Sequence, residues 1–414
     1  IPRHAPRQLA AAISVARRER GPVLLSLPLD VALARIPDIA CPVLEVQPLR
    51  PNERFLDSVA AALSRARRPL ILVGPEARPS APAIRALASR LRIPVMTSPA
   101  AKGIVPEDRP GCLGVFGFGG HPSTRRWLEQ ERPDTLLVLG CSLSEVSTNS
   151  WSELLQPAET MIQLDSDSRR IGVNYRVDLA FAGDWHGAIE AIDRRLNDAA
   201  PKAIDPPRVT RLEAERETED TAVLHPARLL VALQSLLPGD ALFTADIGEN
   251  LLFAVHHLRI REPDQFVTAI ESGSMGSGLG AAVGAKAAAP NRTVVSICGD
   301  YAFQMYGMEL ATCVQEGWDV IFVVMNDARM RMVEAGLTRI YGRTLDMSGP
   351  TIDFAALARA HGAAGVVIET AQDLVEALSA RPTDRPLLLD CRIDPAASFS
   401  ANARVQELGT FNED

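Results

Sequence analysis

The chain has 414 residues, 47% of them hydrophobic and 23% charged, and a formal net charge of −8. This length exceeds what one hydrophobic core supports, so two or three domains are expected. The charges are interspersed without a long basic run, which argues against a nucleic-acid partner, and apolar runs of five or six residues are far shorter than the roughly 20 that span a membrane. The six cysteines form no CxxC pair, so we expect neither a zinc cluster nor a disulfide scaffold, and predict a reduced, cytoplasmic setting.

The first 40 residues predict one helix and one strand. Leu, Ile and Val alternate with Arg at helical spacing over residues 7–19, and GPVLLSLPLDV then predicts a short buried strand that ends at Pro28. These residues lack an initiator Met and the apolar centre of a signal peptide, so we expect a chain that is entered midway. One helix and one strand cannot form a core. Residues 1–40 are expected to be the tail of a further domain, or to pack onto something outside this sequence.

Residues 50–197 predict a central α/β domain. Helical segments such as FLDSVAAALSRA and APAIRALASRL alternate with short apolar runs such as LILVG, PVMTS, TLLVLG and MIQLDSD. Runs of this kind are typical of parallel strands that are buried on both faces. Residues 198–223 are polar, charged and rich in Pro, and predict a linker.

Residues 224–400 predict a second α/β domain, followed by a C-terminal tail at residues 401–414. The domain begins with the helical segment HPARLLVALQSLL and the strand ALFTADIG, and continues through TVVSICGD, DVIFVVMND and PLLLDCRID. The predicted fold class is therefore α/β, with two doubly wound parallel sheets. The central sheet is expected to be Rossmann-like.

Acidic residues follow two neighbouring strands of the second domain. Gly299 and Asp300 end TVVSICGD, and Asn326 and Asp327 follow DVIFVVM. A crossover helix, YGMELATCVQEG, is predicted between them and ends at Gly317. Since a βαβ crossover brings both strand ends to one edge of the sheet, these oxygen ligands are expected to converge there. Carboxylate and carbonyl oxygens beside a phosphate are what Mg²⁺ prefers.

The spacing of these acids resembles the signature of thiamine-diphosphate enzymes in the acetolactate synthase and pyruvate decarboxylase superfamily. That signature is Gly-Asp-Gly, followed some two dozen residues later by Asn-Asn. The resemblance extends in family order through PVLLSLPLDV, IPVMTSPAAKGIVPEDRPGCLGVFG, IQLDSDSRRIGVNY, TADIGEN and SGSMGSGLGAAVGAKAAAP. It implies that residues 1–40 end a pyrimidine-binding domain and that residues 224–400 form the diphosphate-binding domain.

The resemblance also implies roles for individual residues. Asp300, Asp327 and the backbone carbonyl of Arg329 would bind Mg²⁺. The carbonyl of Gly273 would accept a hydrogen bond from the aminopyrimidine, and Met275 would hold the cofactor in a bent shape as a catalytic residue. The full set predicted to contact the cofactor is Glu249, Asn250, Gly273, Ser274, Met275, Gly299, Asp300, Tyr301, Ala302 and Asp327.

The bent cofactor implies the reaction. Bending places a nitrogen of the aminopyrimidine against the acidic carbon of the thiazolium ring and so supplies an intramolecular base. The implied activity is decarboxylation of a pyruvate-like 2-oxo acid, with probable carboligation to an acceptor carbonyl. Residues after Asp327 lack the Gln-Trp pair that acetolactate synthases carry just past the equivalents of Met332 and Val333, so a simple decarboxylase or another carboligase fits as well.

Three departures from the family pattern favour a second hypothesis. Tyr301 stands where the signature has its third Gly, so its side chain must point away from the phosphates or narrow the site. Asp327 stands where the family has Asn, which adds a negative charge beside the metal and diphosphate. No residue before Asp30 matches the glutamate with which the family activates its cofactor. The alternative is a non-catalytic regulatory or assembly relative.

The resemblance implies an oligomer, because the family binds its cofactor between two subunits. We expect a homodimer or homotetramer whose missing pyrimidine-domain segment, with the activating glutamate, is a covalent or separate partner. The small-molecule partner would be a 2-oxo acid.

Several residues have a structural interpretation beside the functional one. Asp300 or Asn250 could cap a helix, and Met275 could fill a core. Glu334 is a candidate catalytic residue facing the substrate, or part of a solvated helix face. His121, His256 and His257 are expected in surface or structural roles. The Gly-rich GFGGH loop and the Gly after LILV could bind FAD or ADP in the central domain, although an empty domain is favoured, and a plain nucleotide-binding protein is a third hypothesis.

Overall fold

The computed structural model describes residues 1–19, 21–43, 47–196, 209 and 224–399. The chain divides into two compact units, residues 1–51 and the residues from Asn52 onward. The predicted linker at 198–223, apart from residue 209, and the predicted tail at 401–414 lie outside the described residues. Among the described residues, no helix combines the length and the apolar composition that a membrane crossing requires.

The first unit contains helices α1 (Ala5–Glu19) and α2 (Leu29–Leu33), preceded by a 3₁₀ turn at Pro2–His4. The predicted helix at 7–19 is confirmed. The predicted buried strand before Pro28 is wrong, because residues 22–28 form no strand and Leu24 is 95% exposed. A strand requires a neighbour that takes up its backbone hydrogen bonds, and the described part of residues 1–51 contains none.

Residues 52–196 contain a six-stranded parallel sheet in the order β3-β2-β1-β4-β5-β6. Its strands are β1 (Pro69–Val73), β2 (Val95–Thr97), β3 (Cys112–Val115), β4 (Thr135–Leu139), β5 (Thr160–Asp165) and β6 (Leu179–Ala182). The helices are α3 (Glu53–Arg65), α4 (Ala81–Leu91), α5 (Pro122–Glu131), α6 (Glu145–Thr148) and α7 (Ala188–Arg195).

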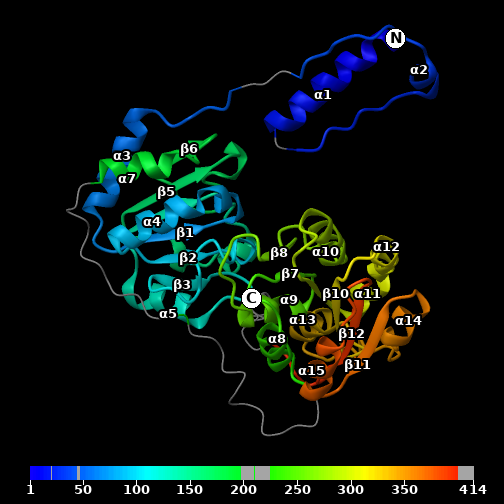
Figure 1. Ribbon diagram of the computed structural model, residues 1–414. Helices are drawn as coiled ribbons and strands as arrows, with labels where there is room; N and C mark the ends of the chain where they lie inside the picture. The colour runs from blue at the N-terminus through cyan, green and yellow to red at the C-terminus, as the bar shows by residue number, and fades with distance from the viewer. Residues whose placement is uncertain (20, 44–46, 197–208, 210–223, 400–414) are drawn as a thin grey trace. The chain divides into compact units, whose positions relative to one another are not determined.

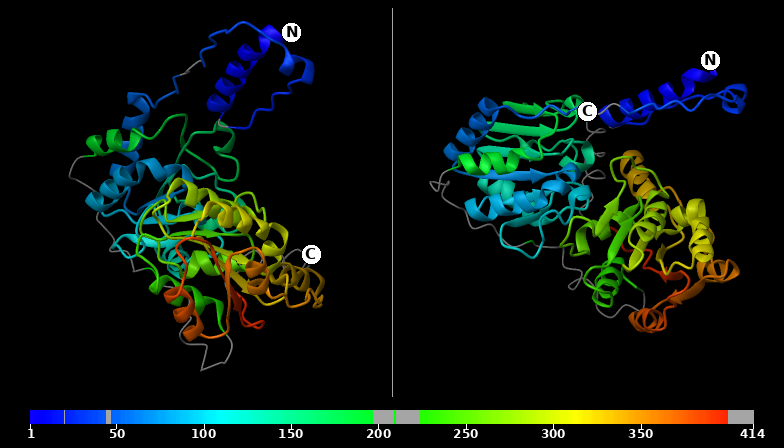
Figure 2. Two further views of the ribbon diagram at one scale, coloured as in Figure 1. Left: turned by 45° about the vertical axis from the view of Figure 1, so that its right-hand side comes forward. Right: turned by 45° about the horizontal axis from the view of Figure 1, so that its top comes forward.

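Both faces of this sheet are covered, which explains why its strands are continuous apolar runs. In β1, Ile71 and Val73 pack with α3, α4 and α7, whereas Leu70 and Leu72 pack with Trp127 of α5 on the other face. The elements can be followed in Figures 1 and 2.

Residues 224–399 contain a second six-stranded parallel sheet in the order β11-β12-β10-β9-β7-β8. Its strands are β7 (Leu242–Ala245), β8 (Phe266–Thr268), β9 (Val294–Gly299), β10 (Ile321–Asn326), β11 (Ala364–Ile368) and β12 (Leu387–Arg392). The helices are α8 (Pro226–Ser235), α9 (Glu249–His257), α10 (Ser277–Ala288), α11 (Asp300–Tyr306), α12 (Leu310–Glu316), α13 (Arg331–Tyr341), α14 (Phe354–Ala360) and α15 (Ala371–Ser379).

Helices again cover both faces. Val323 of β10 faces a core shared with α8, α9 and α15, and Phe322 faces one shared with α10, α11, α12 and α14. These two sheets confirm the predicted α/β class with two doubly wound parallel sheets.

The β9–β10 crossover is helical, and it ends as predicted at Gly317, which adopts a left-handed conformation. It differs from the prediction because it is not one helix: a 3₁₀ turn at Gly307–Glu309 separates α11 from α12. Gly307 lies under the ring of Phe303, where an added Cβ would come within 2.5 Å of ring carbons. The buried ring of Phe303 therefore lies against the backbone of Gly307, where the 3₁₀ turn begins.

Candidate functional site

A cavity of about 210 Å³ lies at the carboxyl edge of the second sheet, and we call it the inner cavity. Most of its lining comes from the turn after β7, the loop before α10, the start of α11 and the segment that follows β10, and the rest comes from Pro226 of α8 and from Ile393 and Ala397 after β12. Of the residues predicted to contact the cofactor or the metal, its lining contains Glu249, Asn250, Gly273, Met275, Gly299, Asp300, Tyr301, Ala302, Asp327 and Arg329. Ser274 and Glu334 are not part of this lining.

Asp300 is held at the end of β9 with one carboxylate oxygen unused. Met325 of β10 pairs with Gly299, so Asp300 follows at the same edge at which β10 ends. Its Oδ1 accepts a hydrogen bond from the Tyr301 amide at 2.7 Å, whereas Oδ2 is buried and has no hydrogen-bond partner among the residues that the structure describes. Burial, and then the nearby charge of Asp327, raises the pKa of Asp300 to about 6. Because Gly299 is the N-cap of α11, Asp300 is not the cap.

The carboxylate of Asp327 is paired with an arginine of the following helix. Arg331 Nε and Nη2 each lie 2.8 Å from Asp327 Oδ2, and Nη2 also donates to the carbonyl of Pro395. Arg331 Nε lies 3.5 Å from Glu249 Oε2, and the pKa of Glu249 is raised chiefly by burial. The sequence analysis did not identify Arg331, although its i, i+4 spacing from Asp327 predicts such a pair.

The turn between β10 and α13 presents main-chain groups to Asp300. Ala328 has φ = 56°, a left-handed conformation that is uncommon for a residue with a Cβ. Arg329 and Ser348 form an isolated antiparallel bridge, whose two hydrogen bonds use the carbonyl of Ala328 and the amide of Met330. Neither bond uses the carbonyl of Arg329. Amides of Ala328 and Arg329 act to lower the pKa of Asp300, against the larger effect of burial.

The loop before α10 is shaped by glycine. Gly276 has φ = 87°, and a Cβ there would lie 2.1 Å from the ring of Tyr306. Gly273 has φ = 63° and open space around it, so its backbone is accessible from the inner cavity. Met275 lies between them, half-buried and lining the cavity while packing on the core below. Ser274 is exposed, and its hydroxyl contacts the carbonyl of Met275 at 3.4 Å.

Asp246 anchors this loop, and the sequence analysis missed it. It is fully buried just after β7, and it accepts hydrogen bonds from the amides of Gly276 at 2.8 Å and Gly278 at 3.1 Å. Its carbonyl accepts from Asn250 Nδ2 at 2.8 Å, so Asn250 is fixed by the same turn and does not cap a helix. Asp246 follows the apolar part of the predicted strand ALFTADIG, and an acidic residue in that position could have marked it as a candidate site residue.

Three other candidates have defined surroundings. Asn326 does not face the cavity, because its amide donates to Asp390 and to the carbonyl of Ile352. Tyr301 lines the cavity, and its hydroxyl approaches Gly349 so closely that a Cβ there would lie 2.3 Å away. Glu334 is buried and pairs with Arg329 at 3.2 Å, so the solvated-face interpretation is wrong.

The three histidines are buried, not surface residues, and the hydrogen bonds of two of them are structural. His121 accepts from the amide of Val115 and donates to the carbonyl of His256, and His256 donates to the carbonyl of Gly120. His257 packs against Phe253 at 6.1 Å between ring centroids. Their surroundings support the predicted structural role.

The carboxyl edge offers few but suitable ligands for a divalent cation. Among the described residues, no group of three or more His, Cys, Asp and Glu side chains is placed to hold a metal. The predicted set needs only the carboxylates of Asp300 and Asp327 and one main-chain carbonyl. The unpartnered, buried Oδ2 of Asp300 is the oxygen that a cation would satisfy, and Mg²⁺ completes its octahedron with water and phosphate oxygens. These residues fit a magnesium ion bound together with a phosphate.

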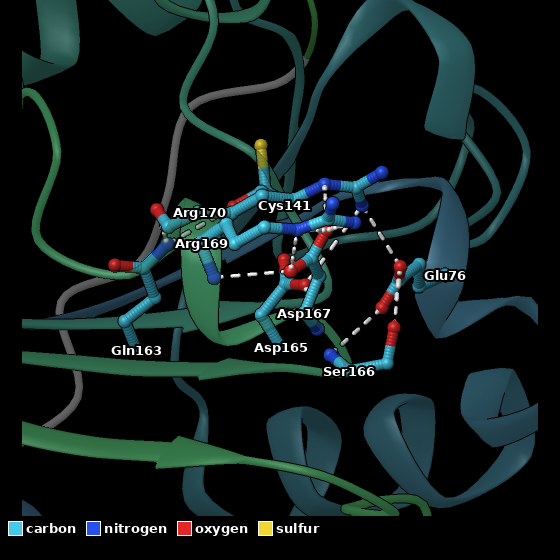
Figure 3. Close-up of polar contacts among 8 residues, drawn as sticks. All are labelled: Glu76, Cys141, Gln163, Asp165, Ser166, Asp167, Arg169 and Arg170. Carbon is cyan, nitrogen blue, oxygen red and sulfur yellow. Dashed lines mark hydrogen bonds and ion pairs between the residues drawn. The ribbon is translucent and has the colours of Figure 1, made fainter. Parts of the chain in front are cut away.

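The glycines considered for a nucleotide in the central domain are explained by packing. A Cβ on Gly74, the residue after LILV, would lie 2.1 Å from the carbonyl of Gly140, and one on Gly117 would lie 2.4 Å from that of Val146. At the carboxyl end of β5, charged side chains pair with one another (Figure 3). Glu76 contacts Arg170 at 2.9 Å, and Asp167 contacts Arg169 at 2.8 Å.

Comparisons with known proteins agree with this geometry. Residues 56–192 match the family model "Thiamine pyrophosphate enzyme, central domain", and residues 246–391 match "Thiamine pyrophosphate enzyme, C-terminal TPP binding domain". Together the two matched segments span well over half of the chain.

Individual relatives and one solved structure are similar along most of the chain. Acetolactate synthase large subunit IlvB1 of Mycobacterium tuberculosis is 29% identical over 409 residues, covering 93% of this chain and 66% of the relative. Sulfoacetaldehyde acetyltransferase of Castellaniella defragrans is 28% identical over 414 residues, covering 89% and 68%. The structure of benzoylformate decarboxylase from Polynucleobacter necessarius has a TM-score of 0.80 at 22% identity, covering 95% and 74%. The matched domains, in their order along the chain and with most of the inner-cavity lining inside the second of them, show that the chain belongs to the thiamine pyrophosphate enzyme family.

Proposed function

We propose that the chain is part of a thiamine-diphosphate and Mg²⁺ dependent enzyme that decarboxylates a pyruvate-like 2-oxo acid and adds the product to an acceptor carbonyl, as an acetolactate synthase does. The observation that carries this proposal is the buried, unpartnered Oδ2 of Asp300, which lies beside Asp327 at the carboxyl edge of the sheet. An unpaired carboxylate in such a place is costly unless a cation compensates it.

The residues around the inner cavity have separate roles in this proposal. Asp300, Asp327 and the carbonyl of Arg329 would hold the metal, and Asn250, with Glu249 beside it, would contact the diphosphate; all five residues line the inner cavity. When bound, thiamine diphosphate supplies a carbon nucleophile for the carbonyl of the 2-oxo acid and accepts the electron pair left by carbon dioxide.

The loop before α10 positions the other end of the cofactor. The carbonyl of Gly273 orients the aminopyrimidine, and Met275 supports the bent shape from the core side, with Ser274 between them. Asp246 keeps this loop in place through the amides of Gly276 and Gly278. Gly299, Tyr301 and Ala302 line the inner cavity beside Asp300 and would form the wall next to the metal.

The proposal includes a glutamate from elsewhere to activate the cofactor. We place it on an upstream segment or on a second chain, with residues 1–40 as the tail of the pyrimidine-binding domain that carries it. The assembly proposed is a cytoplasmic homodimer or homotetramer. FAD or ADP in the central domain is the weaker part of the proposal, because packing explains Gly74 and Gly117 without a ligand.

One observation favours a second candidate, a non-catalytic regulatory or assembly relative. Arg331 already pairs with Asp327, so the metal must share or displace this contact. A simple 2-oxo-acid decarboxylase is the alternative within the catalytic class.

Calorimetric titration of the full chain with thiamine diphosphate, with Mg²⁺ and then with a chelator, tests the proposal. We expect binding that requires the metal. Release of carbon dioxide from pyruvate, measured with any upstream partner chain present, then separates the candidates. Metal-dependent binding without turnover supports the regulatory relative, and binding of FAD or ADP alone contradicts the site assigned to Asp300.

A further inference from the structure

A second hollow lies beside the inner cavity, and we call it the outer cleft. Its volume is about 580 Å³, and its lining consists of Arg329, Arg331, Glu334, Ala335, Thr338, Arg339, Gly342, Thr344 and Ser398. Arg329 and Arg331 line both hollows, so the two hollows adjoin at these two residues.

Helix α13 supplies one polar face to this cleft. Arg331, Ala335 and Arg339 follow one another at i, i+4 spacing, and so do Glu334 and Thr338, which places all five on one side of the helix. Ala335 and Gly342 have small or no side chains, and this leaves space between the longer residues.

The cleft carries an excess of positive charge. Among the residues that the structure describes, its lining holds three arginines and one acid, Glu334, which is already paired with Arg329 at 3.2 Å. Arg331 is paired with Asp327. Asp346, outside the lining, lies close enough to Arg329 for that arginine to lower its pKa, after the hydrogen bonds from Ser348. Arg339 makes no hydrogen bond or ion pair with any other residue that the structure describes, so its guanidinium is available to a ligand.

We propose that the outer cleft binds a second anionic group on the substrate, at the end remote from the reacting carbonyl. The inference rests on the proposed function, because it assigns the substrate class of the same site: a 2-oxo acid with a distal carboxylate. Arg339 provides the planar fork that matches a carboxylate, and the hydroxyls of Thr338 and Thr344 provide further donors. Phosphonate and sulfonate groups share this chemistry.

Calorimetry on the full chain tests the proposal without requiring turnover. The probes are glutarate, which carries two carboxylates, and pentanoate, which has the same chain length and carries one. We expect glutarate to bind at least tenfold more tightly than pentanoate, and Arg339→Gln to abolish this preference. Arg339→Lys, which keeps the charge but loses the fork, should restore part of it. Equal affinities in the unmodified chain, or an unchanged preference in Arg339→Gln, would overturn the proposal.

Arg343→Gln is the matched control, because Arg343 is exposed near the same cleft but does not line it. A loss of preference in this control equal to that in Arg339→Gln would mean that general surface charge is responsible, and would also overturn the proposal. Titrations with 3-phosphonopropionate and 4-sulfobutanoate distinguish the anions: tighter binding than glutarate would reassign the distal group and overturn the carboxylate class.

The titration with thiamine diphosphate separates the two proposals. Glutarate preference without cofactor binding would contradict the proposed function and leave an anion site. Metal-dependent cofactor binding without glutarate preference would contradict only the present inference. If both hold, kcat/KM for 2-oxoglutarate should exceed that for 2-oxopentanoate by tenfold or more, and Arg339→Gln should remove the difference.

Discussion

Two nitrogens of the Arg331 guanidinium, Nε and Nη2, each lie 2.8 Å from the same carboxylate oxygen of Asp327, Oδ2. The pair is nearly buried, and a charge-assisted contact of this kind is stronger than one at the surface. Asp327 brings a negative charge to a site that would also hold a diphosphate. Arg331 supplies the compensating positive charge from the chain itself.

Arg331→Gln should therefore weaken thiamine diphosphate binding at saturating Mg²⁺ by tenfold or more. The loss follows from an uncompensated Asp327, since hydrogen bonds to charged groups contribute about 1.5–3 kcal/mol. The measurement is a calorimetric titration. The double variant Asp327→Asn/Arg331→Gln has the same net charge as the unmodified chain and should bind within a few-fold of it. A double variant that binds as weakly as Arg331→Gln alone would mean that the two side chains do not act as a pair.

Asp300→Ala and Asp327→Asn should have opposite consequences for cofactor retention. Asp300→Ala removes the buried oxygen that awaits a cation, so metal-dependent binding should be abolished. Asp327→Asn keeps an oxygen ligand and removes a repulsive charge, so binding should be retained or tighter. Equilibrium dialysis of thiamine diphosphate with Mg²⁺ measures both. Loss of cofactor in Asp327→Asn would show that the proposed metal geometry is wrong.

The fold could be predicted from sequence where an apolar run has partners within the chain. LILVG and DVIFVVM supply all but one residue of β1 and of β10, and every residue of these two strands is buried. VLLSLPL has a similar composition, yet the described residues 1–51 offer it no neighbouring strand and Leu24 is exposed. The composition of an apolar run indicates that it tends to be buried, whereas its pairing as a strand depends on segments that are distant in sequence. The same pattern therefore predicted one strand that does not form, the one before Pro28.

The site shows the same limit. Asp300 and Asp327 could be placed because parallel strands end at a common edge, a rule that sequence order is enough to apply. The same rule places Asp246 at this edge, directly after β7, but it does not predict its role as the anchor of the loop, because the two amides that it binds lie 30 and 32 residues away in a glycine loop. For Asn326, sequence predicted the correct strand end but not that Asp390 of β12 would take its amide.

Gly276→Ala should destabilise the second domain and weaken cofactor binding. The new Cβ would lie 2.1 Å from the ring of Tyr306, at φ = 87°, so the loop would have to shift away from Asp246. We expect a cost of about 2 kcal/mol or more, from strain and overpacking together. Urea unfolding followed by circular dichroism measures this cost.

Gly280→Ala is the control for this glycine. It lies in the interior of α10 with open space where its Cβ would be, so the substitution should stabilise the helix by about 0.5–1 kcal/mol. Equal effects of the two substitutions would contradict the claim that close packing at Tyr306 requires Gly276.

Asp165, at the carboxyl end of β5, should give the central domain an unusual pH dependence (Figure 3). It is fully buried; its Oδ1 accepts from the Asp167 amide at 2.9 Å, and its Oδ2 has no hydrogen-bond partner in the described part of the chain. Burial is the largest cause that raises its pKa from 3.8 to about 6, and the charge of Glu76 adds to it. A raised pKa means that the folded chain binds the proton more tightly than the unfolded chain. Stability from protonation is therefore complete below about pH 4 and is lost as the pH rises through about 6.

Asp165→Asn should remove this dependence, so that its stability relative to the unmodified chain rises between pH 4 and 6 by up to about 3 kcal/mol. Thermal unfolding followed by tryptophan fluorescence reports mainly on the central domain, because Trp127, Trp151 and Trp185 lie there and only Trp318 lies in the second domain.

Asp167→Asn is the control with the opposite sign, since hydrogen bonds from Arg169 lower the pKa of Asp167 to about 2. The ionised Asp167 stabilises the folded state of the unmodified chain above about pH 4, and this stabilisation is lost as the pH falls towards 2. The same pH slope in both variants would contradict the assignment of the raised pKa to Asp165.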